Sequence, residues 1–152
     1  MMSKKTKLKL LAISIGLIYV WFGALKFFPN LSPAETLATE TIDAMTFHLL
    51  PQGMGYITLA FLEVGIGLGL IVGLRQRVFV IAALVHMVCT FVPLFAFPDL
   101  SFKEAPYGFT IVGQYIMKNL IIIVALLILL PPRKRKSSQT ISKKVSENLE
   151  KA

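Results

Sequence analysis

Four ionisable side chains interrupt otherwise apolar segments of this chain: Glu63, His86, Lys118 and Lys26. A charge in the middle of a membrane costs about 2.5–3.5 kcal/mol on insertion scales, so such a residue normally faces a protein interior or water and has a partner. A carboxyl group beside an imidazole can deliver protons near neutral pH. These residue types therefore indicate a site that binds a polar ligand or handles protons.

The composition is that of a small membrane protein. Of the 152 residues, 55% are hydrophobic and only 16% are charged, whereas soluble domains carry about 25% charged residues. A disordered chain is excluded by the same figures, because disordered chains are poor in apolar residues. The single cysteine excludes a disulfide framework.

Four stretches are long and apolar enough to cross a bilayer, which needs about 20 such residues per helix. They cover residues 10–28, 54–73, 78–97 and 112–130. We therefore predict an all-α fold, a four-transmembrane-helix bundle with a short amphipathic helix in the first outer loop. The expected organisation is a basic cytoplasmic N-terminus (1–9), one membrane domain (10–130) and a basic, flexible cytoplasmic tail (131–152).

The positive charges predict the orientation. Most of the 16 Lys and Arg residues precede the first span, lie between the second and third, or follow the fourth. The positive-inside rule then places both termini in the cytoplasm, as in a multi-pass protein of a bacterial-type plasma (inner) membrane. The bulky Trp21 and Phe22 favour an uncleaved signal anchor over a cleaved signal peptide. We expect the basic termini to contact anionic lipids rather than nucleic acid.

The first outer loop is predicted to form the amphipathic helix. Residues 32–35 read as a capping box with Pro33 at the first helical position. Apolar residues then recur at helical spacing, namely Leu31, Ala34, Leu37, Ala38, Ile42, Met45 and Leu49. The pattern leaves open whether this helix is a packed spacer or a functional lid.

Polar side chains are expected to share faces of the spans. The candidate ligand-binding residues are Glu63, His86, Gln114, Lys118, Asn119, Lys26 and Tyr19. We expect Glu63 either to pair with Lys118 or to stay protonated. For Lys26 the alternative is that it only reaches the outer headgroups, and for His86 that it is a neutral core residue. The catalytic residues stay unassigned, and the few scattered His and Cys residues give no metal site.

Two further features concern helix packing. Pro93 is predicted to free a backbone carbonyl and bend the outer half of the third span. Gly65, Gly69 and Gly73 are spaced by four residues, which predicts a close approach of a neighbouring helix along that face.

Three segments resemble the DoxX-like family of small four-helix membrane proteins. They are WFGALKFFP at 21–29, LEVGIGLGL at 62–70 and GQYIMKNL at 113–120. The resemblance extends over about residues 13–130, and the third segment is the most specific. By position, the motif residues are Lys26, Glu63, Gln114, Lys118 and Asn119; His86 belongs to no motif of the family.

The resemblance implies a four-helix membrane fold and a link to respiratory or redox chemistry. Some members of the family are subunits of a thiosulfate:quinone oxidoreductase, and others are linked to oxidative or sulfur stress. We therefore expect a redox-linked membrane subunit, part of a quinone-linked oxidoreductase, that binds a quinone or a small sulfur species in a polar cavity of the outer half. Its partner would be a redox protein or a further copy of the chain. The alternatives are a non-catalytic assembly or anchoring subunit and a small-solute transporter module.

Overall fold

The computed structural model describes residues 2–32, 35–49, 51, 53–73 and 76–131. The chain is mostly helical, as predicted, and four of its helices are long and apolar enough to cross a membrane. The predicted tail, apart from Pro131, lies outside the described residues, as do the cap residue Pro33 and the stripe residue Ala34.

The long elements are α1 (Lys4–Leu25), α3 (Met54–Val72), α4 (Gln76–Cys89) and α7 (Ile111–Leu129). The first span was predicted to begin at residue 10, but its helix begins at Lys4. Ser3 caps this helix by accepting a hydrogen bond from the Thr6 amide, and lysine is a good helix former. The first four lysines therefore lie in the first turns of α1.

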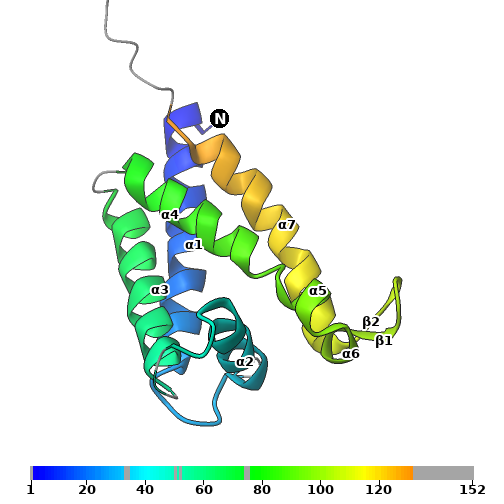
Figure 1. The fold of residues 1–152 in the computed structure, drawn as a ribbon. Helices are drawn as coiled ribbons and strands as arrows, with labels where there is room; N and C mark the ends of the chain where they lie inside the picture. The colour runs from blue at the N-terminus through cyan, green and yellow to red at the C-terminus, as the bar shows by residue number, and fades with distance from the viewer. Residues whose placement is uncertain (1, 33–34, 50, 52, 74–75, 132–152) are drawn as a thin grey trace, which may run out of the picture.

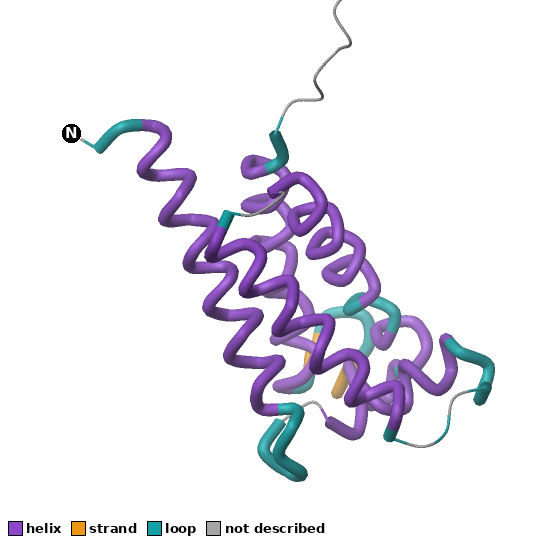
Figure 2. Tube along the Cα trace, turned by 90° about the vertical axis from the view of Figure 1, so that its left-hand side faces the viewer, coloured by secondary structure: helices purple, strands orange, loops and turns teal. Residues whose placement is uncertain are grey.

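The short elements gather at one end of the bundle. They are α2 (Glu35–Met45), α5 (Pro93–Ala96), α6 (Pro98–Ser101) and the antiparallel strands β1 (Phe102–Glu104) and β2 (Gly108–Phe109). The N-terminus and the last turn of α7 both lie at the other end (Figures 1 and 2). The chain crosses the bundle once with each of the four long helices, so it returns to the end at which it began.

Helix α2 confirms the amphipathic helix only in part. Leu37 and Thr41 are buried, whereas Leu31 and Leu49, the outermost residues of the predicted stripe, are 56% and 81% exposed. The helix ends at Met45 because Phe47 and His48 adopt positive φ angles. The predicted stripe therefore extends beyond the helix at both ends.

The third span bends where predicted. Helix α4 ends at Cys89, and α5 begins at Pro93. Pro93 has no N–H, so the carbonyl of Cys89 accepts instead from the Val92 amide at 3.1 Å.

The closest helix pair is α1 with α3, and glycines at their crossing permit it. A Cβ on Gly67 would lie 2.6 Å from the carbonyl oxygen of Gly16, so neither position has room for a larger side chain. The predicted glycine face is not the one that meets α1: Gly65 has open space around it, Gly69 contacts the ring of Phe79, and Gly73 ends α3 at positive φ. The predicted close approach of a neighbouring helix is therefore found at Gly69, against Phe79 of α4, and not at Gly65 or Gly73, while the contact with α1 forms through Gly67.

Candidate functional site

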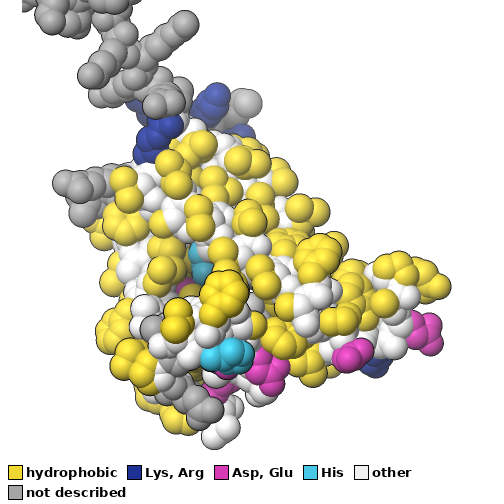
Figure 3. Space-filling view, in the orientation of Figure 1, with side chains coloured by type: hydrophobic (Ala, Val, Ile, Leu, Met, Phe, Trp, Pro, Cys, Tyr) yellow, Lys and Arg dark blue, Asp and Glu magenta, His cyan; other side chains and the backbone are white. Residues whose placement is uncertain are grey.

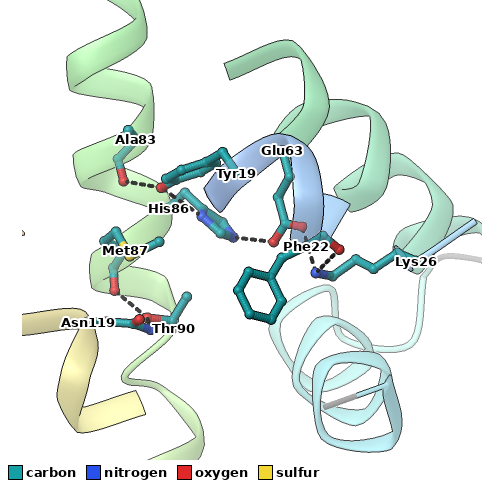
Figure 4. Close-up of polar contacts among 9 residues, drawn as sticks. All are labelled: Tyr19, Phe22, Lys26, Glu63, Ala83, His86, Met87, Thr90 and Asn119. Carbon is teal, nitrogen blue, oxygen red and sulfur yellow. Dashed lines mark hydrogen bonds and ion pairs between the residues drawn. The ribbon is translucent and has the colours of Figure 1, made fainter. Parts of the chain in front are cut away.

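The candidate site is a line of polar side chains from three helices, which we call the buried polar network: Lys26, Glu63, His86 and Tyr19. Lys26 follows the last turn of α1, Glu63 lies in α3, and His86 lies in α4 (Figure 4). Tyr19 comes from α1, two helical turns before Lys26. Because α1 is packed closely on α3, its polar residues can reach both neighbours.

Glu63 lies at the centre of the network. Its Oε2 is 2.6 Å from Lys26 Nζ, and its Oε1 is 3.3 Å from His86 Nε2. The side chains of Lys26, Glu63 and His86 are 9%, 8% and 12% exposed. Lys26 Nζ also donates to the Phe22 carbonyl at 3.4 Å. The carboxylate therefore has a partner on each oxygen, as a buried charge requires.

His86 is held on both sides of its ring. Its Nδ1 lies 3.1 Å from the hydroxyl of Tyr19, whose O–H donates to the Ala83 carbonyl at 3.0 Å. The two rings meet edge to face with centroids 5.5 Å apart. Both ring nitrogens are thus fixed, and the orientation of the imidazole is set by contacts from α1 and α3.

The hydrogen-bond pattern allows two proton arrangements. When the Tyr19 hydroxyl donates to the Ala83 carbonyl, Nδ1 of His86 must donate to Tyr19. The contact between Nε2 and Glu63 then needs a second proton, carried either by a charged imidazole or by a protonated carboxyl group. When the hydroxyl turns to Nδ1 instead, a neutral His86 donates from Nε2 to Glu63. The network can thus hold one proton more or one fewer without a movement of heavy atoms.

Lys118 is not part of this network, which corrects one predicted pairing. Glu63 pairs with Lys26 and not with Lys118, because α3 packs against α1 rather than presenting Glu63 to α7. Lys118 is exposed, with its Nζ 5.1 Å from the centroid of the Tyr115 ring, and Gln114 is exposed one turn earlier. The predicted inward polar face of α7 is therefore an outward one.

Asn119 does face the protein, but it forms a second and separate contact. Its Nδ2 donates to Thr90 Oγ1 at 3.0 Å, and the Thr90 hydroxyl donates to the Met87 carbonyl at 2.6 Å (Figure 4). Thr90 directly follows α4, so this contact joins α7 to the break in the third span. Of the seven candidate residues, four form the network, Asn119 bonds elsewhere, and Gln114 and Lys118 point outward.

The surface gives narrow access to buried polar groups. Figure 3 shows a hollow in an otherwise largely apolar face, within which histidine and acidic side chains are visible. This agrees with the small remaining exposure of His86 and Glu63. Within the described part of the chain there is no group of three or more His, Cys, Asp or Glu residues able to hold a metal ion.

A pocket of about 620 Å³ lies at the end of the bundle that holds the short elements, between α2 and the start of α3. Its lining includes Glu35, Glu40 and Asp43, and none of the described residues that line it is Lys or Arg. An anion would therefore be repelled from this pocket. The pocket is a different feature from the buried polar network, and sequence patterns did not predict it.

The contacts that sequence reasoning missed are mainly backbone carbonyls. The carbonyl of Phe22 accepts from Lys26, and the carbonyl of Ala83 accepts from Tyr19. Every residue has a backbone carbonyl, so the residue type does not predict such a contact. Tyr19 and Lys26 are seven residues apart and both face the network, whereas the side chain of Phe22 between them is 44% exposed and contributes only its carbonyl. The chain matches no protein-family model, no curated protein and no solved structure.

Proposed function

We propose that this chain is a DoxX-like integral membrane protein, with both termini in the cytoplasm of a bacterial-type plasma membrane. Four helices of sufficient length and hydropathy support the embedding. Most of the visible Lys and Arg lie at the end that holds the N-terminus, and acidic side chains lie at the opposite end (Figure 3). That asymmetry is the one expected for a cytoplasmic basic end.

Its proposed role is that of a redox-linked subunit that delivers protons to a quinone in the outer half of the membrane. The observation that carries this proposal is the line of contacts from Lys26 through Glu63 and His86 to Tyr19. A carboxylate, an imidazole and a phenol in series can pass a proton by short steps. A partner protein would supply the electrons.

A quinone fits this site better than an anionic sulfur species. The Glu63 carboxylate lies at the centre of the network and disfavours an approaching anion. A quinone is neutral and dissolves in the hydrocarbon, so it can approach between the helices. Its carbonyl oxygens need hydrogen-bond donors. Lys26 Nζ uses two of its three N–H groups on Glu63 and the Phe22 carbonyl, so one is left, whereas His86 would have to release Glu63 or Tyr19 in order to donate.

A quinone would supply an acceptor for two electrons and two protons, and His86 and Lys26 would hold it. The chain's own residues would hold and move the protons. Lys26 keeps Glu63 ionised when His86 is neutral, and Glu63 then stabilises the charged imidazole when His86 takes a proton. Tyr19 adapts by turning its hydroxyl between Ala83 and His86 Nδ1.

The test is a titration of the purified full-length protein in lipid nanodiscs with a menaquinone analogue and, separately, a ubiquinone analogue. We expect saturable binding of one of them and a loss of about tenfold in affinity for His86→Gln, equal to about 1.4 kcal/mol. His48→Gln is the matched control, because His48 is exposed and pairs only with Asp43. Absence of saturable binding by the wild type would reject the quinone site.

A second candidate function, a non-catalytic assembly subunit, is favoured by one observation. The ion pair of Lys26 and Glu63 lies beside the glycine contacts of α1 and α3, where a Cβ on Gly23 would be 2.9 Å from Glu63 Cβ. A buried pair in that place can set the register of two helices. In that case Glu63→Gln impairs assembly, while neither analogue binds to any variant.

A further inference from the structure

The outward face of α7 carries polar side chains where a membrane-spanning helix would normally be apolar. Gln114 and Lys118 are exposed, and Tyr115, beneath the Lys118 ammonium, is 53% exposed. Lys118 is the eighth residue of α7, which places its Cα about 10 Å along the helix from Ile111 at about 1.5 Å per residue. Within the described residues, no acidic side chain forms an ion pair with Lys118.

The same face has the spacing of a helix-packing seam. Positions alternate by three and four residues through Ile111, Gln114, Lys118, Ile121, Ala125 and Ile128, all of which are exposed except Ala125, which is partly buried against the core. Its isoleucines at 111, 121 and 128 are 70%, 73% and 61% exposed. Such a seam suits one further helix at a small crossing angle, and a polar residue within it selects the partner and the register.

We propose that this α7 seam packs against a transmembrane helix of a different protein, and that this helix places a carboxylate opposite Lys118. The charge decides the chemistry of the partner, because an ammonium in low dielectric is best satisfied by a carboxylate that accepts its hydrogen bonds. Gln114, one turn away, adds an amide that can bond to the same helix. The inference rests on the proposed membrane embedding and not on quinone binding.

A second copy of this chain does not have the required chemistry. Two copies inserted with the same orientation meet through this seam as parallel helices, so Lys118 would face Lys118 at the same depth. The acid at comparable depth, Glu63, is 8% exposed and already bonded to Lys26 and His86. The remaining acids of the described residues lie near the outer end, at Glu35, Glu40, Asp43, Asp99 and Glu104.

The experiment measures energy transfer in lipid vesicles between the labelled full-length protein and synthetic leucine-rich transmembrane peptides. One peptide carries a single Glu about 10 Å from its outer end, and its control carries Gln at the same position. We expect the Glu peptide to bind the wild type about three- to tenfold more tightly than the Gln peptide. Lys118→Met is expected to abolish this difference, and it should fold because Lys118 is exposed.

Lys103→Met is the matched control, since Lys103 is an exposed lysine of β1 in the outer hairpin. It should retain the preference for the Glu peptide. Equal binding of the two peptides by the wild type would overturn the proposal and mean that Lys118 only reaches the lipid headgroups. Energy transfer between two labelled copies that Ile121→Trp removes would also overturn it, by assigning the seam to self-association.

These outcomes are independent of the quinone titration. Loss of the peptide preference with intact analogue binding would reject only the α7 seam. Retention of the preference without analogue binding would reject only the redox proposal.

Discussion

Glu63 and Lys26 are 37 positions apart in the chain, yet Glu63 Oε2 and Lys26 Nζ are 2.6 Å apart and both side chains are less than 10% exposed. The pair connects the end of α1 to the middle of α3. Because His86 contacts the other oxygen of the same carboxylate, the pair also determines how α4 is attached.

Lys26→Met should lower the free energy of unfolding by about 3–5 kcal/mol, because it leaves the Glu63 carboxylate buried without its cation. The measurement is reversible unfolding by SDS in mixed micelles. Lys118→Met is the control and should change stability by less than about 0.5 kcal/mol, because Lys118 is exposed.

The double variant Lys26→Met with Glu63→Gln should recover most of that loss, because both charges are then absent. A double variant as unstable as the sum of the two single variants would show that the residues do not interact.

Gly67→Ala should destabilise the protein by about 1–3 kcal/mol, because the added Cβ would lie 2.6 Å from the Gly16 carbonyl oxygen and 2.8 Å from the Val20 amide nitrogen. Gly65→Ala lies two residues away in the same helix and meets nothing within 4 Å. It should instead stabilise α3 by about 0.5–1 kcal/mol. Thermal unfolding in detergent compares the two, and equal effects would contradict the α1–α3 crossing.

Tyr19→Phe should cost about 1 kcal/mol, because it removes the hydroxyl that joins His86 Nδ1 to the Ala83 carbonyl. Glu63 still accepts from Nε2, so a neutral His86 should keep its proton on that nitrogen. Nitrogen-15 NMR of labelled histidine reports this tautomer directly. Tyr115→Phe is the control on exposed α7 and should leave the His86 signals unchanged.

Asn119→Leu should lower stability by about 0.5–1.5 kcal/mol, because it removes the bond to Thr90 that ties α7 to the end of α4. Gln114→Leu, five residues earlier and exposed, should have almost no effect on the isolated chain. Unfolding by SDS distinguishes the two variants. A larger loss for Gln114→Leu would mean that α7 is rotated relative to the structure.

The elements themselves were largely predictable from the sequence. The second and fourth spans agree with α3 and α7 to within a residue or two, and Pro93 interrupts the third as expected. These features are local, since an apolar run or a missing N–H acts on the few residues around it. The short β1–β2 hairpin was not predicted, because its strands are too brief to show an alternating pattern.

The sequence by itself determined that Glu63 and His86 need polar partners, because hydrocarbon penalises charge whatever the fold. Only the tertiary structure decided that the partner of Glu63 is Lys26 and not Lys118. That choice depends on how the helices rotate and which pair packs closest, and here the room at Gly16 and Gly67 brings α1 onto α3. The same rotation leaves Gln114 and Lys118 on the outside. The spacing of residues along one helix shows which of them share a face, but not which neighbouring helix that face contacts.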